Sequence, residues 1–151
     1  MAELSGIEYA LLSGIADSKI RSTNNQFPVP DGYAIYQELP QNKSGLDAVA
    51  YSNGTKIVIA FGSTENTLKD KITDCALGSG GWTLQLLQAA EFYMDIKSKN
   101  QSAEITFTGY SLGGGLATLL AVLFNEKAVV FNPSRSLNVL KISKKGLLFQ
   151  Y

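Results

Sequence analysis

Apolar residues recur along the chain with two different periods, and these periods predict the order of helices and strands. Near the start they fall at steps of three and four residues, which is typical of one helix face: Leu4, Ile7, Leu11 and Ile15. Residues 82–97 repeat this spacing with Leu86, Ala89, Ala90, Tyr93 and Ile96. Residues 112–124 form a third apolar run. These three segments are predicted to be helices.

Runs rich in β-branched and aromatic residues predict strands at 33–37, 47–52, 55–61, 103–109 and 127–132. Asn53-Gly54 separates the second run from the third, and this pair suits the positive φ angles of a tight hairpin. The last two runs flank the predicted helix at 112–124. A strand, a helix and a strand of these lengths form a crossover that joins parallel strands. The pattern therefore predicts a layered α/β core.

The chain has 151 residues, which is enough for one domain and one buried core, and 45% of them are hydrophobic. Its formal net charge is zero, so nothing indicates a nucleic-acid partner. Residues 135–151 hold four basic side chains and no acidic one. We therefore expect one domain over residues 1–133 and a separate basic tail over residues 134–151.

Features of export and membrane insertion are missing from the start of the chain. Glu3 and Glu8 lie where a signal peptide would be apolar, and the longest apolar run, residues 116–124, is too short to span a bilayer. Cys75 is the single cysteine, so no intrachain disulfide can form. We expect a protein that is cytoplasmic, or exported by a C-terminal signal that this sequence does not contain.

The glycine-rich stretch before the third helix has the spacing of a nucleophile elbow. Gly109 and Gly113 lie two residues before and after Ser111, between a predicted strand and a predicted helix. An elbow needs small residues at these places, because larger ones would collide with the neighbouring strand and helix. Ser111 would then be the nucleophile, and the N–H of Leu112 would stabilise an oxyanion. The alternative is a glycine-rich loop in which Ser111 only caps the helix.

Residues 108–121, Thr-Gly-Tyr-Ser-Leu-Gly-Gly-Gly-Leu-Ala-Thr-Leu-Leu-Ala, resemble the elbow of class 3 lipases, usually GHSLGGALA. Tyr110 replaces the histidine that usually precedes the serine in this family. That histidine is not the catalytic base. Residues 58–64 are similar to the family's VVAFRGT strand end, with Gly-Ser in place of Arg-Gly. This resemblance implies that Thr64 supplies the second oxyanion donor.

Two further segments extend the resemblance, which covers residues 3–133. Asp70 and Asp74 match the acidic positions of the family's DWxxD stretch, and residues 129–133 resemble its TFNAP strand. Residues 65–81 lie where such lipases carry a mobile lid. The apolar face of this segment allows transient contact with a membrane surface, although a helix fixed to the core is the alternative.

The resemblance to this family implies an α/β-hydrolase fold, a three-layer sandwich with a mixed, mostly parallel sheet that is incomplete at its C-terminus. The implied activity is hydrolysis of carboxylic esters, chiefly of lipids, through an acyl-Ser111 intermediate. The resemblance calls for no metal and no other cofactor. The expected partner is therefore a lipid or other ester substrate.

The residues that would activate Ser111 are missing. The chain has no histidine, and Glu126, the one acid after Ser111, lies between a helix and a strand, away from the family's catalytic acid. Three explanations remain open. The chain is a truncated product of a longer lipase, a non-catalytic lipase-like binding module, or an enzyme that uses a lysine or aspartate, such as Asp70 or Asp74, as its base.

Two expectations follow from this gap. By itself the chain should hydrolyse esters weakly or not at all. The sheet should also end at the strand over residues 127–132, and its unpaired apolar edge would allow self-association.

Overall fold

The structure is a computed structural model that describes residues 3–21, 27–40, 44–63, 80–133 and 148–150. Its elements, in chain order, are α1 (Gly6–Arg21), β1 (Ala34–Glu38), β2 (Leu46–Ser52), β3 (Lys56–Ser63), α3 (Gly80–Lys99), β4 (Glu104–Tyr110), α4 (Leu112–Phe124), β5 (Lys127–Phe131) and β6 (Leu148–Gln150). All three predicted helices and all five predicted strands are present, with ends that differ by a few residues.

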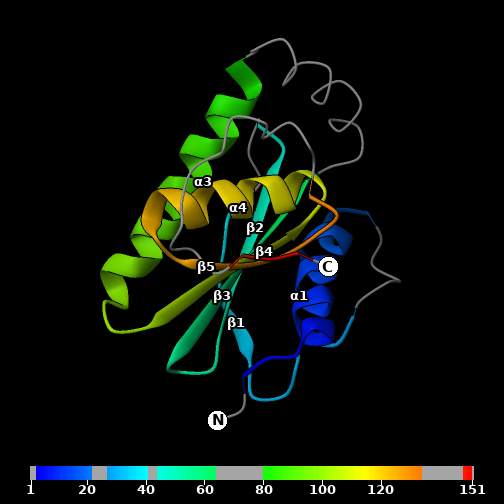
Figure 1. The fold of residues 1–151 in the computed structure, drawn as a ribbon, viewed down its shortest axis with the longest axis vertical. Helices are drawn as coiled ribbons and strands as arrows, with labels where there is room; N and C mark the ends of the chain where they lie inside the picture. The colour runs from blue at the N-terminus through cyan, green and yellow to red at the C-terminus, as the bar shows by residue number, and fades with distance from the viewer. Residues whose placement is uncertain (1–2, 22–26, 41–43, 64–79, 134–147, 151) are drawn as a thin grey trace.

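The strands form one sheet in the order β1-β2-β3-β4-β5-β6 (Figure 1). β1, β2 and β3 pair antiparallel, whereas β3, β4, β5 and β6 run parallel. The predicted hairpin joins β2 to β3, where Gly54 has a φ of +98° and the Asn53 side chain accepts hydrogen bonds from the N–H groups of Thr55 and Lys56. The sheet is therefore mixed and mostly parallel, as predicted.

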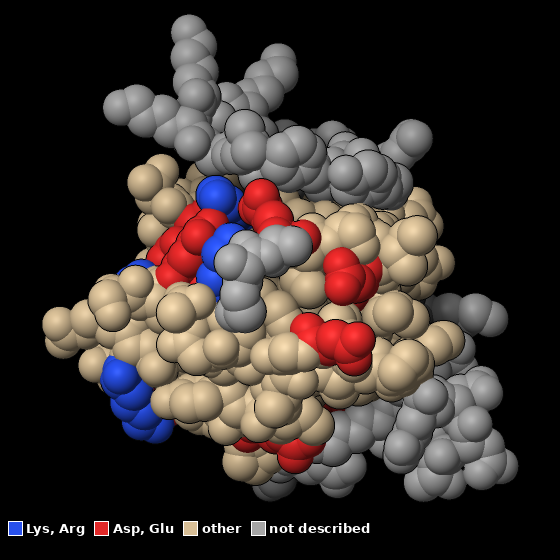
Figure 2. All heavy atoms as spheres, turned by 90° about the horizontal axis from the view of Figure 1, so that it is seen from below, with Lys and Arg blue, Asp and Glu red and all other residues tan. Residues whose placement is uncertain are grey.

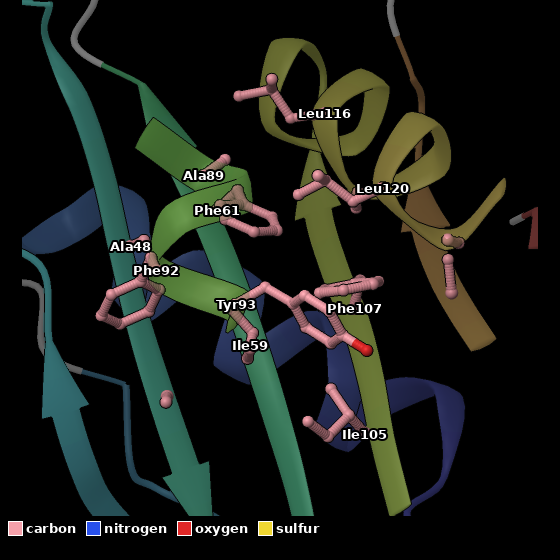
Figure 3. Packing of buried hydrophobic residues seen from close by; sticks show 14 of the residues in the cluster. Ala48, Ile59, Phe61, Ala89, Phe92, Tyr93, Ile105, Phe107, Leu116 and Leu120 are labelled. Atoms are coloured by element: carbon pink, nitrogen blue, oxygen red, sulfur yellow. The ribbon is translucent and has the colours of Figure 1, made fainter. Parts of the chain in front are cut away.

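Helices cover both faces of the sheet, which gives three layers. α1 packs on one face, over a cluster that includes Tyr51 and Val58, and α3 and α4 pack on the other. On the face that α3 and α4 cover, the ring of Phe107 in β4 packs near those of Phe61 and Tyr93, with ring centroids 5.9 and 5.3 Å away (Figure 3). The two hydrophobic layers bury both faces of the sheet and leave its strand ends uncovered by this packing.

The face that α1 buries differs from the predicted one. Ile7 is 76% exposed, and the buried residues are instead Tyr9, Leu12, Ser13 and Ala16. The small side chains of Ser13 and Ala16 let the helix backbone approach the sheet closely, which larger side chains would prevent. The periodicity thus predicted the helix correctly and its buried face in part, because Leu4 and Ile15 pack against the buried cluster while Ile7 does not. The predicted apolar face of α3 packs inward, with Ala89, Tyr93 and Ile96 buried.

The expectation of an unpaired edge at β5 is wrong. β6 pairs with β5 in parallel, with Ala128 opposite Leu148, Val129 opposite Phe149 and Val130 opposite Gln150. Main-chain N–H and C=O groups of an edge strand bond to any extended segment that reaches them, and here the last residues of the chain do so. β6 therefore belongs to the sheet although it lies within the basic tail. Within the described residues, no helix is both long and apolar enough to cross a membrane.

Candidate functional site

Ser111 lies at a sharp turn between β4 and α4, as the elbow spacing predicts. Its φ of 52° and ψ of −115° make it one of three non-glycine residues in the described part of the chain with a positive φ. Its N–H donates a hydrogen bond to the carbonyl oxygen of Phe131 (3.0 Å), and its own carbonyl oxygen accepts one from Gly115 (3.0 Å). Such a conformation costs on the order of 1–3 kcal/mol and persists only where the surrounding contacts hold it.

The glycines around Ser111 are required by contacts between main chains. A β-carbon on Gly109 would lie 2.4 Å from the carbonyl carbon of Gly113, and one on Gly113 would lie 2.1 Å from the carbonyl oxygen of Phe61. One on Gly114 would lie 3.0 Å from the oxygen of Gly109. The start of α4 therefore packs directly on the ends of β3 and β4, with no room for side chains.

The hydroxyl of Ser111 is not used to cap α4. Among the described residues Ser111 forms no side-chain cap hydrogen bond, although it occupies the N-cap position. This finding argues against the interpretation of Ser111 as a simple cap. The side chain of Leu112 is buried, while its N–H lies in the first turn of α4, where no acceptor within the helix can reach it. A hydroxyl and a main-chain donor thus come together at a positive helix terminus.

The carboxyl end of β3 lies beside the elbow. Phe61 pairs with Gly109 in the parallel ladder, and Gly62 and Ser63 extend β3 past this pair. In open α/β sheets, ligands bind outside the carboxyl ends of the strands. Thr64, Asp70, Asp74 and most of the lid candidate over residues 65–81 lie outside the described residues.

Glu126, at the other end of α4, contacts two side chains of α3. The hydroxyl of Tyr93 donates a hydrogen bond to its Oε1 (2.8 Å), and the Nζ of Lys97 lies 3.4 Å from the same oxygen. Burial raises the pKa of Tyr93, and the bond to Glu126 raises it further. The 13 residues of α4 span about 20 Å, which separates Glu126 from Ser111. Glu126 is therefore not the acid of a triad with Ser111.

The lysines of the described strands also lie away from Ser111. Lys56 and Lys127 begin β3 and β5, and both contact Glu104 at the start of β4, at 3.6 and 2.6 Å. Figure 2, which views the molecule from below, shows acidic and basic side chains side by side on that face. Within the described residues, no group of three or more histidine, cysteine, aspartate or glutamate side chains could hold a metal.

One buried polar residue was not singled out from the sequence. Gln85 of α3 is 1% exposed, and its Nε2 donates a hydrogen bond to the carbonyl oxygen of Ser44 (2.7 Å), just before β2. The signal was present in the spacing, because Gln85 lies on the same helix face as the buried Ala89, Phe92 and Ile96. A glutamine in line with an apolar stripe indicates a buried hydrogen bond.

Comparisons with known proteins identify the family and the fold. Residues 30–144 match the family model of the Tle-like phospholipase domain. An extracellular phospholipase A1 of Serratia liquefaciens is 35% identical over 89 residues, which are 59% of this chain and 27% of that protein. The chain therefore spans about a quarter of the curated relative that it matches.

Solved structures of fungal lipases have the same fold. Lipase II of Rhizopus niveus is 15% identical with a TM-score of 0.62, over 85% of this chain and 61% of that one. A lipase of Rhizopus microsporus var. chinensis is 16% identical with a TM-score of 0.58, over 96% of this chain and 55% of that one. The predicted resemblance to lipases and the α/β-hydrolase fold are both confirmed, and the chain covers only part of these structures.

Proposed function

This chain belongs to the family of Tle-like phospholipase domains, and from this we propose that it is the nucleophile-bearing part of a serine hydrolase that cleaves lipid esters. The observation that carries the proposal is the backbone of Ser111, with its positive φ and its hydroxyl not used as a helix cap. Strained residues of this kind concentrate at functional sites. The phospholipase and lipase relatives support a lipid ester as the substrate class.

In the proposed reaction, a base takes the Ser111 proton as the Ser111 oxygen attacks the ester carbonyl, and the ester C–O bond then breaks so that the alcohol leaves with that proton. Water hydrolyses the resulting acyl-enzyme and releases the carboxylic acid. The N–H of Leu112 donates to the oxyanion from the first turn of α4, and the positive end of the helix adds to this stabilisation. Thr64, by its position after β3 in the sequence, is proposed as the second donor. No metal or other cofactor takes part in this scheme.

The base of the reaction is not a histidine of this chain, which contains none. We propose that a histidine and its acidic partner come from another part of the enzyme, since the chain spans 61% or less of the lipase structures above. Loss of a triad member lowers kcat on the order of 10⁶-fold in a serine protease and leaves an acceleration of about 10³–10⁴-fold over the reaction in water. The chain by itself should therefore be a weak esterase at most.

A non-catalytic lipase-like binding module is the second candidate, and the lack of histidine favours it. Such a protein would retain the fold and bind a lipid without cleaving it. The strained backbone at Ser111 argues against this candidate, because binding alone does not require a hydroxyl held in that conformation.

The test supplies the missing base from solution. Hydrolysis of p-nitrophenyl butyrate is measured for the chain, for Ser111→Ala and for Ser98→Ala, a control at an exposed hydroxyl far along α3. We expect little turnover without imidazole. With imidazole, and after subtraction of the rate that imidazole gives without protein, we expect an increase that Ser98→Ala keeps and Ser111→Ala loses.

Other outcomes separate the candidates. Rapid turnover without imidazole that disappears in Ser111→Ala would show that the chain is a hydrolase and that it has a base of its own. Equal rates for the chain and Ser111→Ala with imidazole, together with binding of phospholipid vesicles, would contradict the hydrolase and favour the binding module.

A further inference from the structure

α3 carries a buried amide that the proposed reaction does not use. Gln85 is 1% exposed, among the most buried side chains of the described residues. A buried amide without a hydrogen bond costs on the order of 1–3 kcal/mol by mutational data. Its Nε2 donates to the carbonyl oxygen of Ser44 at 2.7 Å, so α3 is tied to the loop that precedes β2.

A second contact reinforces this tie one turn further along α3. The hydroxyl of Ser44 donates to the side-chain oxygen of Gln88 and also accepts a hydrogen bond from the N–H of Leu46 (3.2 Å). Between them, Gly45 has a φ of 72°, a backbone conformation that suits glycine. Ser44 is 5% exposed. Its main chain and its hydroxyl are both held, which fixes the residue at which β2 begins.

The start of β2 lies directly beside the end of β3. Leu46 pairs with Ser63 and Asp47 pairs with Gly62 in the antiparallel ladder. On the same end of β3, the carbonyl oxygen of Phe61 lies against Gly113 of the elbow helix. The end of β3 is thus held between β2, which is tied to α3, and the turn that carries Ser111.

We propose that Gln85 is a positioning residue that, through Ser44, holds the carboxyl end of β3 in register beside Ser111. This inference rests on the proposed function, because its consequence is the position of the carboxyl end of β3 relative to Ser111. A misplacement of about 1 Å can lower a rate on the order of 100-fold. Gln85 touches no reacting atom and acts only through the strands.

The test removes the donor and keeps the length of the side chain. Gln85→Met is compared with Gln101→Met, the same change at an exposed glutamine after α3. We expect Gln85→Met to speed hydrogen exchange at residues 61–63 and to lower the kcat of imidazole-assisted, Ser111-dependent ester hydrolysis at least tenfold. KM should change little, and Gln101→Met should change neither quantity. Gln88→Met, at a half-buried position, should change the exchange rate and kcat in the same direction but by less. It replaces Gln85→Met in the test if that variant does not fold.

Three outcomes would overturn the inference. The first is unchanged exchange at residues 61–63 in a folded Gln85→Met protein. The second is a lower melting temperature with unchanged kcat where both proteins are folded, which is the result of a purely structural role. The third is an equal fall in kcat for Gln101→Met. If the wild-type chain shows no Ser111-dependent rate, the proposed function fails, and the exchange rates alone decide whether Gln85 holds β3.

Discussion

Gly113 of α4 contacts the main-chain carbonyl oxygen of Phe61 in β3 so closely that a β-carbon on Gly113 would lie 2.1 Å from that oxygen. The two residues are 52 positions apart in the sequence. Their contact seats the elbow helix on the end of the strand that borders the candidate site. The second glycine of the motif is therefore required by the packing of α4 on β3.

Gly113→Ala should destabilise the protein by about 3 kcal/mol or more, at the upper end for overpacking. The obstructing atoms belong to the main chain and cannot rotate away. Urea denaturation measures this change. Gly32→Ala is the matched control, since its β-carbon would meet nothing within 4 Å and only its φ of +82° costs energy, about 1–2 kcal/mol. Equal losses in the two variants would contradict the packing argument.

Ser111→Gly should be more stable than Ser111→Ala by about 1 kcal/mol. Glycine relieves the strain of the positive φ, on the order of 1–3 kcal/mol, and loses about 0.5–1 kcal/mol of that gain to backbone entropy. Urea denaturation of both variants tests this difference. At Ser98, inside α3, the order should reverse, because glycine is less stable than alanine in a helix. An alanine variant as stable as the glycine variant at position 111 would show that the turn is not strained.

Glu104 should make stability depend on pH through its contact with Lys127. A hydrogen bond from Lys127 is the main cause that holds the pKa of Glu104 below its ordinary value of 4.5. Its contribution is therefore fully present above about pH 4.5 and is lost as pH falls through the lowered pKa. Glu104→Gln should lose at most about 1 kcal/mol at pH 7, because the pair is exposed and screened. The difference from wild type should shrink toward pH 3.

Denaturation curves at several pH values measure this effect. Glu91→Gln, at an exposed position on α3, is the control and should differ less from wild type. A loss for Glu104→Gln that stays constant between pH 7 and pH 3 would exclude the ion pair as its cause. High salt should reduce the loss as well.

Removal of residues 148–151 should increase self-association. The deletion frees the main-chain groups of Ala128–Val130 that β6 now pairs, and an unpaired apolar edge promotes strand addition. Sedimentation velocity over a range of concentrations detects the change. Removal of residue 151 alone leaves β6 intact and should have no effect. A monomer at all concentrations after the longer deletion would show that β6 does not protect the edge.

Local physics explains why much of this protein could be read from its sequence. The period of apolar residues is set by the geometry of each helix or strand, and Asn53-Gly54 contains the turn chemistry of its hairpin within two residues. The elbow spacing is local as well, because Gly109 meets Gly113 across a single turn. These features gave the elements, the mixed sheet and the place of Ser111, and the family match then confirmed the resemblance to lipases.

Tertiary contacts decided the rest, because each joins residues far apart in the sequence. The buried face of α1 depends on how closely Ser13 and Ala16 approach the sheet. The strand on the outer side of β5, β6, has only three residues and no recognisable apolar period. Gln85 meets Ser44 41 positions away, and Glu126 meets Tyr93 33 positions away. A pattern along the chain reports the shape of each element, whereas the partner of a side chain is fixed only when the elements pack together.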